Sequence, residues 1–195
     1  MISSLVLATT NAGKLRDFRL LFEGSGIQIQ VPGDFGVDLE VDETGTTFEA
    51  NALLKARAFA AALPGRAVLA DDSGLAVEAL GGEPGVYSAR YAGAHGDDHA
   101  NNLEVLRRME GVSDRRAAFV VVLALVTPGG AEVVVEGRCE GTIATEERGN
   151  NGFGYDAVFW CEDLGRTFGQ VTPAEKNARS HRAAAVCALL EKLKV

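Results

Sequence analysis

Short apolar runs, separated by polar turns, mark the strands that this chain is expected to form. Most runs are continuous, but the segment from Ile27 to Val31 alternates with glutamines, the period of a strand buried on one face. The turn Thr127-Pro128-Gly129-Gly130 joins two runs into a predicted hairpin. The predicted strands cover residues 5–8, 27–31, 67–70, 119–126, 132–138 and 155–160. After a polar break, residues 75–80 could form another strand.

Apolar residues at helical spacing predict the helices between these strands. The segment from Thr46 to Glu49 has the spacing of a capping box, and the helix that follows stops at Pro64-Gly65. The segment from Thr172 to Glu175 is a second capping box, with proline at the first helical position. The predicted helices cover residues 14–23, 48–63 and 98–110, with a further one from Pro173 onward.

Helix-linked strands together with a hairpin predict an α/β fold with a mixed sheet flanked by helices. At 195 residues the chain is expected to be one domain, 1–195, with two lobes and no clean boundary. The hydrophobic fraction of 47% is enough for a sizeable core.

Composition restricts the expected cellular compartment and the expected classes of binding partner. No apolar run approaches the roughly 20 residues of a membrane helix, and the N-terminus has no secretory pattern. Three widely spaced cysteines fit neither a disulfide framework nor a zinc site, so a cytoplasmic protein is expected. A net charge of −8 argues against a partner such as duplex nucleic acid, but allows a small polyanion in a local lysine pocket.

Two polar segments follow apolar runs, where an open α/β sheet binds its ligands. Thr9 to Lys14 joins a strand to a helix and presents backbone N–H groups and a lysine to an anion; the alternative is a plain turn with a solvated lysine. Asp71-Asp72 is a pair of hard oxygen ligands that suits Mg²⁺; the alternative is an aspartate that caps a turn. Glu43, before the helix that carries Lys55, is a candidate partner carboxylate or a solvated loop residue.

Two later segments suit the recognition of a base. Glycines flank Phe153, so its ring can stand clear of the backbone and stack on a base, unless it enters the core. His181 and Arg182 supply donors for the polar edge of a base, or lie on a helix surface. On one straight helix Lys176 and Arg182 would point about 120° apart. If both serve one pocket, the helix breaks near Ser180.

Taken in order, these segments closely resemble the inosine triphosphatase family, Ham1-like proteins also called XTP/dITP diphosphatases. The resemblance runs from Leu5 to about Leu190, and the chain departs from the family pattern at Ala50, Ala157 and Gly169-Gln170. The segments that carry it are Thr9 to Lys14, Glu43 to Lys55, Ala70 to Leu75, Gly85 to Tyr91, Phe153 to Asp156, Glu175 to Asn177 and Ser180 to Arg182.

The resemblance implies a two-lobed fold with a cleft between the lobes, a homodimer, and Mg²⁺-dependent hydrolysis of ITP, dITP and XTP to the monophosphate and pyrophosphate, which cleanses the nucleotide pool. By this resemblance Asp72 and Lys55 are catalytic, and Asp72 and Glu43 bind the metal. The residues expected to bind the nucleoside triphosphate are Thr9, Thr10, Asn11, Ala12, Gly13, Lys14, Ser73, Phe153, Gly154, Tyr155, Asp156, Lys176, His181 and Arg182.

Two other functions remain open at this point. Maf-like nucleotide pyrophosphatases have a similar architecture and act on pyrimidine or modified nucleotides, but His181-Arg182 favours a purine. A nucleotide-binding module without catalysis is disfavoured by the Asp71-Asp72 pair and by three candidate phosphate lysines, Lys14, Lys55 and Lys176.

Overall fold

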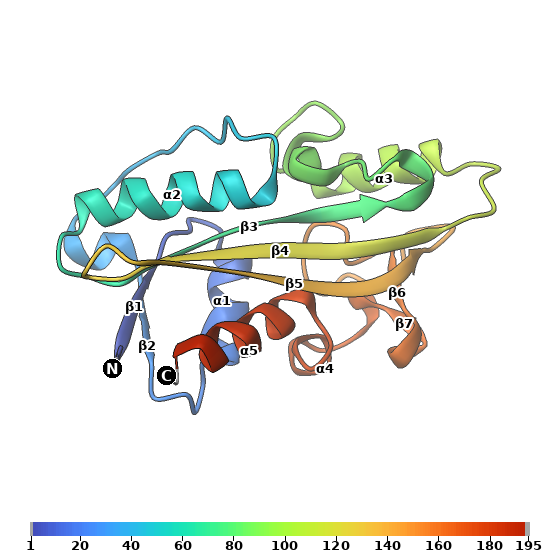
Figure 1. Cartoon of the computed structure of the whole chain (residues 1–195). Helices are drawn as coiled ribbons and strands as arrows, with labels where there is room; N and C mark the ends of the chain where they lie inside the picture. The colour runs from blue at the N-terminus through green and yellow to red at the C-terminus, as the bar shows by residue number, and fades with distance from the viewer. Residues whose placement is uncertain (1, 194–195) are drawn as a thin grey trace. The chain divides into compact units, whose positions relative to one another are not determined.

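The computed structural model describes residues 2–193 and has the expected α/β architecture, a mixed sheet flanked by helices (Figure 1). The strands are β1 (Ser4–Leu7), β2 (Gln28–Gln30), β3 (Val68–Val77), β4 (Arg116–Val126), β5 (Glu132–Ile143), β6 (Phe159–Cys161) and β7 (Arg166–Thr167). The helices are α1 (Ala12–Leu21), α2 (Phe48–Ala62), α3 (Asp98–Arg108), α4 (Pro173–Asn177) and α5 (His181–Leu193), with short 3₁₀ turns such as Gly85–Arg90 between them.

The strands form one sheet in the order β2-β1-β3-β4-β5-β6-β7. β1 is parallel to β2 and β3, whereas β6 is antiparallel to β5 and β7. The chain divides into two compact units, each assembled from separate segments. Unit 1 comprises Met1–Asp72, Val121–Gly137 and Arg182–Val195, and unit 2 comprises Ser73–Val120 and Arg138–His181.

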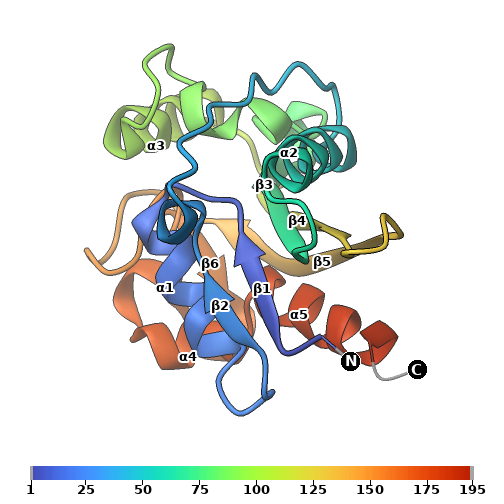
Figure 2. The same ribbon diagram turned by 90° about the vertical axis from the view of Figure 1, so that its left-hand side faces the viewer.

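In unit 1, helices cover both faces of the sheet (Figure 2). Successive strand residues point to opposite faces. Leu5 and Leu7 therefore pack with Phe18 of α1 and with α5, while Val6 packs with Ala52 of α2 on the other face. Burial of one such large side chain contributes about 1.5–3 kcal/mol. This two-sided burial explains why the strand runs are continuously apolar.

Unit 2 has a single core, built around aromatic side chains. The rings of Phe119 and Phe159 lie 4.5 Å apart, and Phe168 packs against both. Met109 at the end of α3 and Tyr155 from the loop before β6 complete the same core.

Several predicted boundaries differ from the structure. The strand expected to stop at Ala70 continues through Asp71-Asp72 to Val77, so that these carboxylates lie within β3 and not at its end. The strand expected from Tyr155 begins only at Phe159, because residues 155–158 form a hydrogen-bonded turn. Thr47, and not Thr46, caps α2, since its hydroxyl accepts from the Ala50 amide at 3.1 Å.

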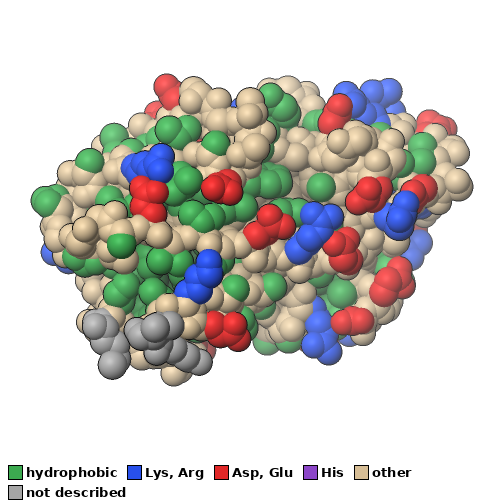
Figure 3. Space-filling model, viewed as in Figure 1, with side chains coloured by type: hydrophobic (Ala, Val, Ile, Leu, Met, Phe, Trp, Pro, Cys, Tyr) green, Lys and Arg blue, Asp and Glu red, His purple; other side chains and the backbone are tan. Residues whose placement is uncertain are grey.

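The expected break near Ser180 is present. α4 ends at Asn177 and α5 begins at His181, and Thr172 with Glu175 forms the predicted capping box of α4. No helix among the described residues is long and apolar enough to cross a membrane. Basic and acidic side chains are interspersed over the face drawn in Figure 3.

Candidate functional site

The turn between β1 and α1 is built from the predicted segment Thr9 to Lys14. The Thr9 hydroxyl accepts from the Asn11 amide at 3.2 Å, and the Asn11 side chain caps α1 by accepting from the Lys14 amide at 3.0 Å. The first N–H groups of a helix have no partner within it and favour an anion. Thr10 precedes the cap residue Asn11, and Ala12 and Gly13 are the first two residues of α1.

Asp71 is buried among cations in unit 1. Its carboxylate lies 2.8 Å from Lys14 Nζ, and it is only 1% exposed. Burial alone would raise the pKa of Asp71, but the charges of Lys14, Lys55 and Arg182 lower it below the ordinary value. Arg182 is also buried and pairs with Asp17 of α1 at 3.4 Å. Asp71 therefore pairs directly with Lys14 and interacts electrostatically with Lys55 and Arg182.

Asp72 lies in a different environment, in contact with α2. Asn51 Nδ2 donates to Asp72 Oδ2 at 3.0 Å. Burial raises the pKa of Asp72 to about 6; the charge of Lys55 opposes this shift and the charge of Glu43 adds to it. A carboxylate with a pKa of about 6 holds a proton more strongly than an ordinary aspartate, which suits a general base.

Lys55 and Glu43 form an ion pair beside Asp72. Lys55 Nζ lies 2.5 Å from Glu43 Oε1, and the lysine side chain is 13% exposed. Burial lowers the pKa of Lys55, but the charges of Asp71, Asp72 and Glu43 outweigh it and raise the pKa overall. The preceding loop is fixed because the Gly45 amide donates to Asn51 Oδ1 at 2.7 Å. A Cβ on Gly45 would lie 2.6 Å from that oxygen.

The two predicted metal ligands fit a hard cation. Asp72 and Glu43 both offer carboxylate oxygens. Burial is the main cause of the raised pKa of Asp72 and the charge of Glu43 adds to it, and a cation would offset both effects. Among the described residues, no group of three or more His, Cys, Asp or Glu side chains is placed to hold a metal. A magnesium ion here would therefore depend on substrate phosphates and water for its other ligands, as is usual for Mg²⁺.

In unit 2, Asp156 organises the loop that carries Phe153. The Phe153 amide donates to Asp156 Oδ2 at 3.0 Å, and Lys176 of α4 forms a buried ion pair with the same oxygen. Lys176 Nζ also lies 4.7 Å from the centroid of the half-buried Phe153 ring. A Cβ on Gly152 would lie 2.0 Å from Asp156 Oδ2, so only glycine fits there. The structure thus brings Phe153, Asp156 and Lys176 together.

Two further predicted residues of unit 2, His181 and Tyr155, contact its aromatic core. The His181 ring stacks on Phe119, with centroids 4.9 Å apart and planes 17° apart. The Tyr155 hydroxyl donates to the Ser88 carbonyl at 2.7 Å, which ties its loop to the turn after β3. Ser73 is half-buried and directly follows Asp72 in β3.

Three polar side chains, among other residues, contact the predicted ones without having been assigned a role from the sequence. Asn51 holds Asp72, Asp17 pairs with Arg182, and Asp98 of α3 accepts from the Gly154 amide at 2.6 Å. The first two carry a weak signal, because Asn51 lies four residues before Lys55 and Asp17 three residues after Lys14, on one helix face each. The contact of Asp98 joins positions 56 residues apart, so no local sequence pattern predicts it.

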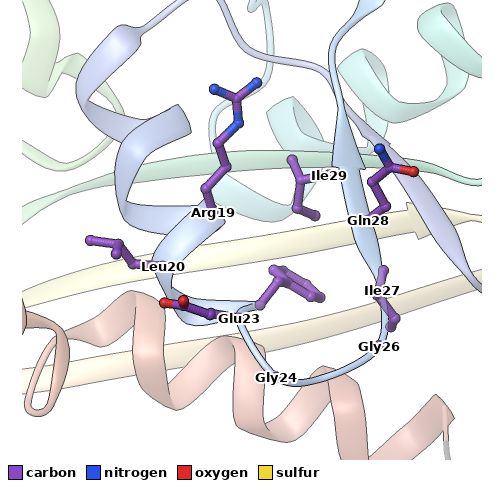
Figure 4. A pocket seen from close by; sticks show the side chains of 9 residues that line it. Arg19, Leu20, Glu23, Gly24, Gly26, Ile27, Gln28 and Ile29 are labelled. Atoms are coloured by element: carbon purple, nitrogen blue, oxygen red, sulfur yellow. The ribbon is translucent and has the colours of Figure 1, made fainter.

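A surface pocket of about 620 Å³ lies at the opposite end of α1 from Lys14 (Figure 4). Its lining comes from the end of α1, the following turn and β2, and includes Arg19, Glu23 and Ile27. None of the predicted site residues lines it.

Known proteins resemble the chain over nearly its whole length. A dITP/XTP pyrophosphatase of Geobacillus kaustophilus is 47% identical over 97% of this chain and 94% of its own length. One of Thioalkalivibrio sulfidiphilus is 49% identical over 97% of each chain. The structure of the Staphylococcus aureus Ham1 protein matches with a TM-score of 0.87 at 42% identity, covering 98% of both chains.

A second solved structure, a nucleoside-triphosphatase / dITP/XTP pyrophosphatase of Mycobacterium abscessus, matches with a TM-score of 0.76 at 47% identity. It covers 96% of this chain and 98% of its own. The model of the Ham1 family matches residues 5–192. The resemblance inferred from the sequence motifs is thereby confirmed, and the chain belongs to the Ham1 family.

Proposed function

We propose that this protein hydrolyses ITP, dITP and XTP to the nucleoside monophosphate and pyrophosphate. The observation that carries the proposal is Asp72, a buried carboxylate with a pKa near 6 that is held by Asn51 and flanked by Lys55 and Glu43. Membership of the Ham1 family supports it, as do relatives named dITP/XTP pyrophosphatases.

In this mechanism Asp72 accepts the proton of the attacking water. The lysines act by charge: Lys14 and Lys55 would turn from Asp71 and Glu43 toward phosphate oxygens as negative charge builds up on the leaving pyrophosphate. The amides at the start of α1 would hold further phosphate oxygens. Asp72 and Glu43 would hold Mg²⁺, which supplies charge neutralisation and a more acidic water.

Base recognition falls to other residues in this proposal. Phe153 would stack on the base, and Lys176 and Asp156 would hold the Phe153 loop and bind the nucleotide. Arg182 and His181 would donate to the keto oxygen at position 6 of hypoxanthine or xanthine. Adenine has an amino group there, so the same donors would be left unpaired, which discriminates strongly.

The test is pyrophosphate release from a panel of nucleoside triphosphates, with and without Mg²⁺. We expect rapid release from ITP, dITP and XTP with Mg²⁺, slow release from GTP and very slow release from ATP. Preference for CTP or UTP would indicate the Maf-like alternative. Binding of ITP without release would indicate a module without catalysis.

The oligomeric state and the cellular compartment are part of the same proposal. We infer a homodimer in the cytoplasm, from the family resemblance and from the three free cysteines. Light scattering coupled to size-exclusion chromatography tests the oligomeric state, because a dimer would have twice the monomer mass of 20.5 kDa.

A further inference from the structure

The Phe153 loop, residues 144–158 between β5 and β6, is held firmly at its base. The Arg148 amide donates to the Ala157 carbonyl at 2.8 Å, which closes the loop on itself. Asn151 donates from its backbone amide to the Gly169 carbonyl and from its side chain to the Val171 carbonyl, both at 3.0 Å. These contacts hold the two arms of the loop and position 151, two residues before Phe153.

The apex consists of Phe153 between two glycines with left-handed backbone angles. Gly152 has φ +77° and Gly154 has φ +61°. Glycine populates this region and many others at little cost, so a segment of this composition is intrinsically flexible. A single ring direction therefore requires contacts that restrict the two peptide planes on either side of Phe153.

Two carboxylates contact those planes, one for each, and the Asp156 amide also donates to the Phe153 carbonyl at 3.3 Å. The amide of Phe153, in the plane before its Cα, donates to Asp156 Oδ2 at 3.0 Å. The amide of Gly154, in the plane after that Cα, donates to Asp98 Oδ2 at 2.6 Å. Because peptide groups are planar, the two bonds together restrict both backbone dihedrals of Phe153.

The second contact comes from α3, which also reaches the loop at another point. Glu147 accepts from Asn102 Nδ2 at 2.8 Å and pairs with His99 Nδ1 at 2.8 Å. The first two turns of α3 thus hold the loop near its start through Glu147 and at its apex through Gly154. All these residues belong to unit 2.

We propose that Asp98 is a positioning residue for base recognition, which holds, through the Gly154 amide, the backbone from which the Phe153 ring projects. The inference rests on the proposed function, because it takes the ring as the surface on which the purine stacks. Asp98 makes no contact with substrate in this proposal. Removal of the Asp98 carboxylate would weaken binding of the base and leave the rate of the chemical step unchanged.

The experiment compares Asp98→Ala with Asp98→Asn and with a matched control, Asp97→Ala. Asp97 precedes Asp98 and caps α3 by accepting from the Ala100 amide at 3.0 Å, so its loss removes an equal charge from the same helix end. With ITP we expect Asp98→Ala to raise KM about tenfold with kcat within twofold, as for loss of uniform binding. Asp98→Asn keeps an oxygen acceptor, so its KM for ITP should lie near that of wild type. Asp97→Ala should lower thermal stability and keep KM within twofold of wild type.

Hydrogen–deuterium exchange without nucleotide gives a readout that is independent of catalysis. Peptides covering residues 150–156 should exchange faster in Asp98→Ala than in wild type or Asp97→Ala. The proposal is overturned if Asp98→Ala matches Asp97→Ala in KM, or if Asp98→Asn is as impaired as Asp98→Ala. If the wild-type protein releases no pyrophosphate from any triphosphate, the proposed function fails and the role in base recognition fails with it; the exchange difference then reports only the loop contact.

Discussion

Asp71 and Asp72 are adjacent in β3 but face opposite sides of the sheet. Asp71 meets Lys14 of α1 on one side, and Asp72 meets Asn51 of α2 on the other. The separation gives the two carboxylates opposite shifts: the pKa of Asp71 is lowered by surrounding cations despite its burial, whereas burial raises the pKa of Asp72 to about 6. One carboxylate is thereby kept ionised as a counter-charge, and the other is suited to proton transfer.

Replacement of Asp72 by asparagine tests its proposed role as proton acceptor. Asp72→Asn keeps the size of the side chain but removes its basicity, so we expect kcat for ITP to fall at least 100-fold while circular dichroism stays unchanged. A folded variant with more than about a tenth of wild-type kcat, a barrier change below roughly 1.4 kcal/mol, would contradict the assignment.

The acid limb of the pH–rate profile should report Asp72. Since kcat/KM follows the ionisation of the free enzyme, we expect kcat/KM for ITP to decline as the pH falls through about 6. The residual activity of Asp72→Asn should lack this limb. A wild-type profile that stays flat down to pH 5 would show that Asp72 does not need to be ionised.

Stability should depend on pH through the same group. The folded-state pKa of Asp72 is raised from 3.8 to about 6, so its contribution to stability is fully present below pH 3.8 and is lost as the pH rises through 6. A shift of about two pKa units corresponds to about 3 kcal/mol. The free energy of unfolding in urea, measured for both proteins at pH 4 and at pH 7, should therefore fall more for wild type than for Asp72→Asn as the pH rises. An unchanged difference between the two proteins would contradict the shift.

Two glycines of the Phe153 loop form a matched pair. Both have positive φ, but a Cβ at Gly152 would collide with Asp156, whereas a Cβ at Gly154 meets nothing within 4 Å. Gly154→Ala should thus cost only the backbone strain of about 1–2 kcal/mol. Gly152→Ala should cost more and also raise KM for ITP, because Asp156 must move. Equal effects in thermal melts and kinetics would show that Asp156 does not constrain the loop.

Arg182 tests how the base is read. Arg182→Ala should lower kcat/KM for ITP far more than for ATP, because only the keto oxygen of ITP can accept from the guanidinium. Asp17→Asn is the comparison: it removes the carboxylate partner of Arg182 but leaves the guanidinium in place. An equal loss on ITP and ATP in Arg182→Ala would indicate that Arg182 holds phosphate or structure and does not read the base.

Much of the fold follows from local patterns in the chain. The runs at Leu5 and Val121 are continuously apolar because helices cover both faces of their strands, and that composition is visible in the sequence. The break near Ser180 was also predictable, since Lys176 and Arg182 are out of phase on one helix. The family was identified from ordered motifs, each of which is weak alone.

Tertiary structure decided what no local pattern encodes. Asp71-Asp72 read as the end of a strand because two carboxylates interrupt an apolar run; β3 continues through them because Lys14 and Asn51, brought in by two different helices, satisfy one carboxylate each. Asp98 likewise acquires its contact only when α3 folds against a loop 56 residues away. The sequence by itself determined the elements and the candidate chemistry, because periodicity and motif order are local. Which charges neutralise one another depends on long-range packing, and only the fold decides that.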